Sequence, residues 1–190
     1  ATVTASRDEL LQRHWLPFRR VVAAGTDAIM IAHLAVPALT GNDEPASIAS
    51  EVTDAARNEL GFDGLLVSDA VVMGGLSKVL DGRSAAVAVV EAGADVVLAP
   101  GDPISARDAL MSAVQDGRIS EARIDASVRR VLRAKLDRGI LIPEGEVFTR
   151  RFRHVRGLDP GRVLADPEHS RVVETIIARA EKARGTVATP

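Results

Sequence analysis

The chain has 190 residues, of which 46% are hydrophobic and 26% charged, a composition that is ordinary for a globular protein and excludes disorder as its main state. The net charge of −2 gives no global attraction to nucleic acid, and no apolar run reaches the roughly 18 residues that a membrane span needs. Because the chain has no cysteine and four scattered histidines, we expect no thiol chemistry, no metal and no cofactor. The sequence does not indicate a compartment.

Three segments share a Gly-x-Asp pattern that is followed by an apolar run. They begin at Gly25, Gly61 and Gly93, at spacings of 36 and 32 residues. Each apolar run is continuous instead of alternating, which is typical of a strand buried on both faces of a parallel sheet. The pattern therefore predicts three parallel strands.

The stretches between these strands carry hydrophobic residues at helical spacing. The predicted helices cover residues 7–24 with a break at Pro17, 50–60 with Ser50 as N-cap, 83–92, 104–116, and 125–138 with Asp125 as N-cap. An alternation of helices and strands predicts right-handed βαβ crossovers. The fold class is therefore α/β, and a period near 34 residues favours part of a (β/α)8 barrel over a doubly wound open sheet.

The chain changes character after Gly139. Residues 140–167 hold prolines and glycines among many arginines and predict a linker, while residues 168–183 again predict a helix. We therefore expect one domain over residues 1–140 and a linker with a helix over residues 141–190. The arginine face of the helix before the linker is expected to be solvated surface, and it comprises Arg129, Arg130, Arg133 and Arg138.

Two reactive side chains occupy equivalent positions at the ends of two predicted strands. Aligning the three units places His33, Asp69 and Gly101 at the same offset. Function in a parallel sheet lies at the carboxyl ends of the strands, so Asp69 is a candidate for chemistry, with an N-cap as its alternative role. His33 is either a hydrogen-bonded histidine at a strand end, a donor to a substrate hydroxyl or a neighbour of Asp69.

The aspartates that precede the three strands lie at the opposite end of the sheet from any such site. We expect turn or capping roles for them, and they are Asp27, Asp63 and Asp95. Met73 alone indicates packing, and the Gly74-Gly75 pair could let the backbone approach a ligand. His14 lies within a helical pattern and is not a candidate for acid/base chemistry.

Several stretches together resemble glycoside hydrolase family 3, in particular its bacterial β-N-acetylhexosaminidase branch. These are Leu16–Arg19, Ala24–His33, Pro45–Ser50, Gly61–Met73, Ala92–Leu98 and Ile124–Lys135. The resemblance covers about residues 8–140 and corresponds to strands six to eight of a (β/α)8 barrel. The residue after Asp69 is Ala70 where β-glucosidase-type members usually have tryptophan, and Met73 follows, as in the hexosaminidase branch.

The resemblance implies retaining hydrolysis of terminal β-linked N-acetylglucosamine, with Asp69 as nucleophile and His33 and Met73 as substrate-binding residues. It implies carbohydrate partners such as peptidoglycan or chitin fragments. The family's Lys-His-Phe-Pro-Gly-His-Gly motif and its acid/base loop would lie upstream of Leu16–Arg19. We therefore expect the upstream half of the barrel as a partner, and a chain that is inactive or nearly so alone.

Two other classes of function stay open. A non-catalytic interaction fragment would use Asp69 only as a cap. A phosphoacceptor domain also uses an aspartate that ends a parallel strand, but it requires paired acids after an earlier strand and a lysine after a later one. The three lysines, at positions 78, 135 and 182, do not fit that arrangement.

Overall fold

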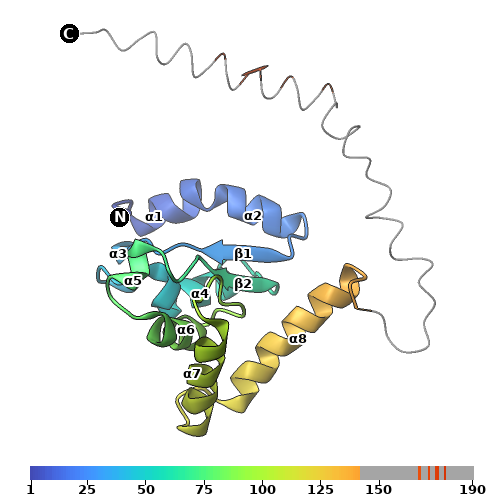
Figure 1. Cartoon of the computed structure of the whole chain (residues 1–190). Coiled ribbons are helices and arrows are strands. Elements are labelled where there is room, and N and C mark those ends of the chain that lie inside the picture. The colour runs from blue at the N-terminus through green and yellow to red at the C-terminus, as the bar shows by residue number, and fades with distance from the viewer. Residues whose placement is uncertain (142–166, 168–170, 172–173, 176–177, 179–190) are drawn as a thin grey trace. The chain divides into compact units, whose positions relative to one another are not determined.

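The computed structural model describes residues 1–141 and five residues of the tail, 167, 171, 174, 175 and 178. Residues Ala1–Leu136 form one compact unit. The elements are α1 Arg7–Glu9, the π-helical turn η1 Leu10–His14, α2 Leu16–Ala23, β1 Ala28–Ile31, α3 Pro37–Thr40, the 3-10 turn η2 Ala46–Ile48, α4 Ser50–Asn58, β2 Leu65–Ser68, α5 Gly74–Ser77, α6 Gly82–Glu91, α7 Pro103–Gln115 and α8 Glu121–Asp137 (Figure 1).

The sheet consists of two parallel strands. β1 and β2 lie side by side, with Ala28 opposite Leu65 and Ile31 opposite Ser68 (Figure 1). The predicted third strand is wrong as a regular strand: its segment runs beside β2 and forms one isolated parallel bridge, between Val67 and Val96. The described fold is thus α/β with a small parallel sheet, and the barrel remains a prediction.

The segment after Gly93 does not continue the backbone pairing with β2, because its next hydrogen bond is made to a side chain. The amide of Leu98 donates to the hydroxyl of Ser68 at 3.1 Å instead of to a strand carbonyl. At the next residue, Ala99, a positive φ of 43° turns the chain away from an extended course. The apolar run after Gly93 therefore predicted the place of this segment beside β2 but not its conformation.

The two faces of the sheet differ. One face buries Ile29, Ile31 and Leu66, which pack with Phe62 and with residues of α2 and α4. On the other face Met30 is 52% exposed, and its burial alternates with that of its neighbours along β1. The prediction that each strand is buried on both faces is wrong for β1, because the described residues leave this face uncovered.

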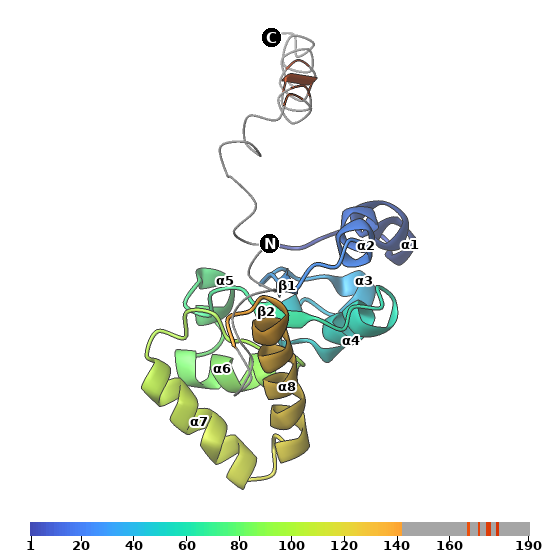
Figure 2. The same cartoon turned by 90° about the vertical axis from the view of Figure 1, so that its right-hand side faces the viewer.

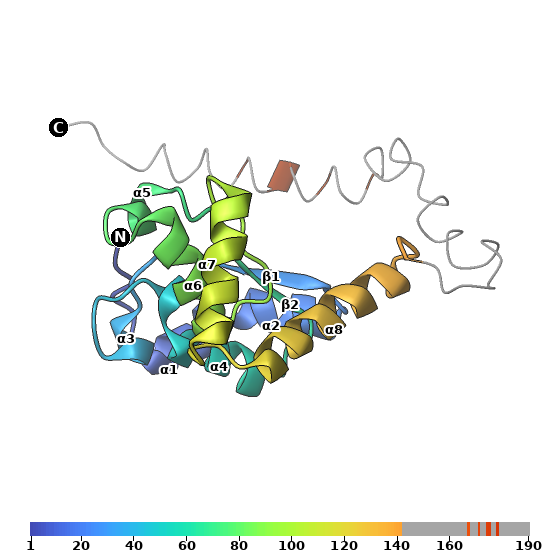
Figure 3. The same ribbon diagram turned by 60° about the horizontal axis from the view of Figure 1, so that its bottom comes forward.

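A second hydrophobic cluster lies under the helices that follow β2. Val71 and Leu76 from the segment after β2 pack with Val89 of α6 and Ala113 of α7, and all four are buried. Figures 2 and 3 show α6 and α7 next to each other. Through Val71 and Leu76, this cluster anchors the segment that follows β2 to α6 and α7.

Most predicted helices are confirmed, with corrections at their ends. Pro17 lies in the first turn of α2, directly after η1, so the expected break is present. Ser50 is the first residue of α4, and the N-cap position belongs to Ala49. α8 begins at Glu121, where the hydroxyl of Ser120 accepts from the Arg123 amide, and the expected cap Asp125 lies inside the helix.

The repeated glycines share one conformation. Gly25, Gly61 and Gly93 have φ values of 80°, 64° and 115°, which residues with a Cβ rarely adopt. The repeat in the sequence is therefore a repeat of the turn that starts each strand segment. In the tail the five described residues are helical, and the other residues after 141, including the predicted linker, lie outside the described part.

Candidate functional site

Asp69 directly follows β2 at the carboxyl ends of the two strands. Its backbone amide donates to the carbonyl oxygen of Ile31 at 2.9 Å, which continues the pairing with β1 by one residue. Its side chain is half-buried, and one carboxylate oxygen accepts from the amide of Ala70 at 2.8 Å. The backbone of Asp69 is thus fixed by the sheet, and its carboxylate is oriented by the next peptide.

The carbonyl oxygen of Ala70 connects the three residues that the sequence singled out. It accepts from the backbone amide of Met73 at 2.9 Å, which closes a turn over residues 70–73. It lies 3.0 Å from Nε2 of His33. At the other end of the same peptide bond, the amide of Val71 donates to the carbonyl of Leu98 at 3.1 Å. The structure therefore brings Asp69, His33 and Met73 together around one anchored peptide.

His33 is buried, with 7% of its surface exposed, and both ring nitrogens have protein partners. Nε2 faces the Ala70 carbonyl, and Nδ1 lies 2.6 Å from the hydroxyl of Ser47, which is also buried. A carbonyl oxygen only accepts, so Nε2 carries a proton; when Nδ1 carries none, it accepts from the Ser47 hydroxyl. Of the roles left open by the sequence, the strand-end histidine and the neighbour of Asp69 fit these contacts.

Met73 lies at the exposed side of the same turn. It occupies the N-cap position of α5 and is 49% exposed, so its side chain is accessible beside Asp69's loop. The Gly74-Gly75 pair was predicted to let the backbone approach a ligand, but at Gly75 the group approached is His33. A Cβ on Gly75 would lie 2.9 Å from Cβ of His33 and 3.1 Å from its carbonyl oxygen. Gly75 lets α5 pack directly on the His33 backbone.

The opposite ends of the strands hold an ionic network that sequence reasoning missed. The Asp95 side chain is fully buried; it pairs with Arg57 at 2.6 Å and Arg130 at 3.2 Å, and it accepts from the hydroxyl of Ser127 at 2.6 Å. It also accepts from the Leu66 amide at the start of β2, at 3.0 Å. Asp95 thus ties α4, β2 and α8 together, well beyond the expected turn role.

The pKa of Asp95 reflects these partners. Burial alone would raise it, but the hydrogen bonds from Ser127 and from the Leu66 amide, together with the charges of Arg57 and Arg130, outweigh burial and lower the pKa below its ordinary value. Arg130 was expected on a solvated face, and that expectation is wrong, because its side chain is only 28% exposed. Arg129, at 78%, fits the expected surface.

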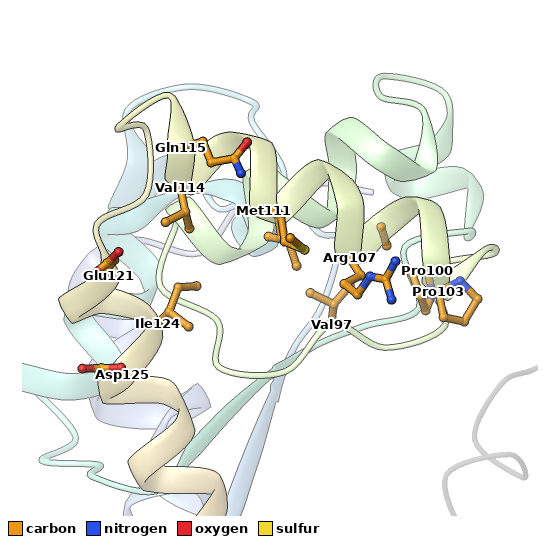
Figure 4. A pocket seen from close by; sticks show the side chains of 12 residues that line it. Val97, Pro100, Pro103, Arg107, Met111, Val114, Gln115, Glu121, Ile124 and Asp125 are labelled. Atoms are coloured by element: carbon orange, nitrogen blue, oxygen red, sulfur yellow. The ribbon is translucent and has the colours of Figure 1, made fainter.

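An apolar pocket of about 620 Å³ lies elsewhere, between α7 and α8. Met111 and Val114 of α7 and Ile124 of α8 contribute to its wall (Figure 4). None of the three predicted site residues lines it. This pocket is therefore separate from the anchored peptide after β2.

Within residues 1–141 and the five described tail residues, no helix is long and apolar enough to cross a membrane. The same residues contain no group of three histidine, aspartate or glutamate side chains arranged to hold a metal ion.

Relatives of this chain are glycoside hydrolases. It is 29% identical over 185 residues to the beta-N-acetylglucosaminidase/beta-glucosidase of Cellulomonas fimi, covering 92% of this chain and 31% of that protein. It is 36% identical over 107 residues to the beta-hexosaminidase of Chromobacterium violaceum, covering 56% of this chain and 29% of that protein. The chain thus spans about a third of the length of these relatives.

Solved structures agree with this result. A glycoside hydrolase family 3 beta-N-acetylglucosaminidase from Paenibacillus sp. str. FPU-7 superposes with a TM-score of 0.70 at 39% identity, over 77% of this chain and 30% of that one. The family model described as "Glycosyl hydrolase family 3 N terminal domain" matches residues 1–134, which include the whole anchored peptide and both of its supporting segments. The chain therefore belongs to glycosyl hydrolase family 3.

Proposed function

We propose that this chain supplies the nucleophile of a retaining β-N-acetylglucosaminidase, and that Asp69 is that nucleophile. The observation that carries the proposal is the position of Asp69, one residue past β2 with its amide bonded to Ile31 of β1. Catalytic groups of parallel α/β barrels come from the carboxyl ends of strands. The names of the relatives support an N-acetylglucosaminide as substrate.

The proposed first step forms a covalent glycosyl-enzyme intermediate. A carboxylate oxygen of Asp69 attacks the anomeric carbon, while the bond to the leaving oxygen breaks with its electron pair and that oxygen takes a proton from a second group. The Ala70 amide holds one carboxylate oxygen at 2.8 Å and so restricts the rotation of the nucleophile. Water, activated by the same second group, then hydrolyses the intermediate.

The second group is proposed to come from an upstream part of the barrel. Retaining enzymes hold the two catalytic groups about 5–5.5 Å apart. The family motifs that accompany the acid/base group have no match in these 190 residues. The uncovered face of β1, with Met30 half-exposed, is where further strands of a (β/α)8 barrel would pack. We therefore propose that this chain alone hydrolyses unactivated substrates very slowly.

His33 and Met73 are proposed to serve the same site in different ways. Met73 is exposed on the turn after Asp69 and can contact the sugar directly. His33 has both ring nitrogens engaged by protein groups, so its contribution is through the backbone that it holds. The non-catalytic interaction fragment is the alternative, and one assay separates it from the proposal.

The assay measures release of 2,4-dinitrophenol from its β-N-acetylglucosaminide by the chain and by Asp69→Asn. This leaving group needs little acid assistance, so the rate depends chiefly on the nucleophile. We expect turnover that Asp69→Asn abolishes and that the control Asp63→Asn keeps, because Asp63 lies at the other end of β2. Turnover that survives Asp69→Asn would contradict the role of Asp69.

Three further outcomes are informative. Faster release from the corresponding β-glucoside would contradict the proposed sugar while leaving the nucleophile in place. No release from either protein would mean that the sugar site also needs the upstream part of the barrel. Rapid hydrolysis of an unactivated N-acetylglucosaminide would contradict the proposed absence of the second group.

A further inference from the structure

We propose that His33 is a positioning residue, which uses the buried hydroxyl of Ser47 to fix its tautomer and holds the Ala70 carbonyl so that Asp69 and Met73 keep their relative placement. The role deepens the proposed function, since it concerns the same loop. It does not require His33 to touch the substrate. Four observations support it.

The first observation is the shared acceptor. The Ala70 carbonyl oxygen accepts both the Met73 amide at 2.9 Å and the His33 Nε2–H at 3.0 Å. The Met73 bond closes the turn, and the His33 bond ties that turn to the end of β1, two residues beyond Ile31. A displacement of this carbonyl would therefore move Met73, and through the Ala70 backbone it would move the amide that holds Asp69.

The second observation is the direction of the hydrogen bonds. Nε2 must donate to the Ala70 carbonyl, and in the Nε2–H tautomer Nδ1 accepts from the Ser47 hydroxyl at 2.6 Å, so the bonds run in one direction from η2 to the loop after β2. Ser47 is 1% exposed, and water does not compete for its hydroxyl at the surface. Without Ser47 the ring could take the other tautomer, whose Nε2 lone pair would face the lone pairs of the Ala70 carbonyl.

The third observation is the packing of His33. Its Cβ and carbonyl oxygen are approached by Gly75 so closely that any side chain there would overlap them. The backbone and Cβ of His33, from which the ring extends, therefore cannot shift toward Gly75 without moving α5. The fourth is the Val71 amide, which is bonded to Leu98 at 3.1 Å, so the peptide that His33 holds is fixed at both of its polar groups.

A matched pair of variants tests the role. In His33→Gln the side-chain amide nitrogen reaches about the place of Nε2 and can still donate to the Ala70 carbonyl. In His33→Asn the shorter side chain can accept from Ser47 but cannot reach Ala70. Each variant loses one buried hydrogen bond, so a merely structural role predicts similar losses of stability and of activity for both.

We expect the two variants to differ in activity at similar melting temperature. His33→Asn should lower the rate of dinitrophenol release about tenfold, the effect of one lost buried hydrogen bond, while His33→Gln should stay within about threefold of the parent chain. Ser47→Ala should fall between them. Equal losses of rate in the Gln and Asn variants would overturn the proposal.

A second readout does not depend on turnover. Long-range ¹H–¹⁵N spectra of the full chain near about pH 8, where an ordinary histidine is neutral, should show the His33 ring as the Nε2–H tautomer. The His33 signals are assigned by their loss in His33→Gln, and they should change in Ser47→Ala. The amide signals of Ala70 and Met73 should move in His33→Asn and stay in His33→Gln.

The rate measurement and the spectra together separate the proposal for Asp69 from the proposal for His33. If the chain shows no turnover that depends on Asp69, the proposed nucleophile fails in this chain, but the tautomer and the amide signals still decide the role of His33. An Nδ1–H tautomer, or amide shifts that are the same in both His33 variants, would overturn the positioning role even if Asp69 proves to be the nucleophile.

Discussion

The two ends of the short sheet present the same residue type in opposite ways. Asp69, after β2, is half-buried and receives one hydrogen bond, from its neighbour Ala70. Asp95, at the start of the third segment, is fully buried; it is paired with three arginines and accepts hydrogen bonds from a serine hydroxyl and a backbone amide. The carboxylate at one end is accessible to a reactant, and the carboxylate at the other end is not.

The comparison separates an end of the sheet that stabilises the fold from an end whose carboxylate is accessible. At the amino ends of the strands, charges hold α4, β2 and α8 together through Asp95. At the carboxyl ends, hydrogen bonds from His33 and from the Met73 amide hold the Ala70 carbonyl. They leave the side chains of Asp69 and Met73 accessible. The (β/α)8 barrel, which is the architecture predicted for this chain, has a stabilising face and a catalytic face. Three changes test the comparison.

The largest expected effect is on stability, at the amino ends. Asp95→Asn should lower the free energy of unfolding by about 3 kcal/mol, because it leaves Arg57 and Arg130 without their buried counter-charge. Chemical denaturation of the two proteins measures this loss. The control Asp63→Asn removes a carboxylate that is 86% exposed and should change the stability by less than about 0.5 kcal/mol. Equal effects of both variants would break the comparison.

The sequence predicted much of this arrangement because its signals are local. The shared offset of His33 and Asp69 after their apolar runs predicts that both lie at one edge of the sheet, and the Ala70 carbonyl indeed brings them together. Helix positions follow from the spacing of hydrophobic residues, and the break at Pro17 follows from its missing amide. These features depend on residues within one turn or one strand.

The sequence did not predict features that depend on distant partners. Asp95 meets Arg57 and Arg130, which are 38 and 35 residues away, and an aspartate before a strand looks the same when it only caps a turn. Ser47 contacts His33 across 14 residues, and nothing in the Pro45–Ser50 stretch separates a buried hydroxyl from a surface one. The end of the third strand depends on the Leu98 amide finding a side chain instead of a carbonyl.

A smaller effect is expected at the carboxyl ends, where α5 packs tightly against His33. Gly75→Ala should lower the free energy of unfolding by about 1–3 kcal/mol, because its Cβ would overlap the His33 backbone and force α5 to shift. The neighbour Gly74 offers a matched control, since a Cβ there meets only the flexible Lys78 side chain, at 3.7 Å. Gly74→Ala should be neutral or should stabilise the helix by up to about 1 kcal/mol. If both substitutions were neutral, the loop would be looser than these contacts require.

The smallest effect concerns the pH dependence of stability and tests the buried carboxylate of Asp95. The pKa of Asp95 is lower in the folded chain than its ordinary value of 3.8, so the unfolded chain binds the proton first as the pH falls. Its contribution to stability is therefore complete well above pH 3.8 and is lost as the pH falls through the folded pKa. Unfolding measured between about pH 6 and pH 2 should show a decline in stability that is shallower in Asp95→Asn, by at most about 1.4 kcal/mol per pH unit. An unchanged slope in Asp95→Asn would mean that the ionic network at the amino ends does not carry the acid-sensitive stability of the fold.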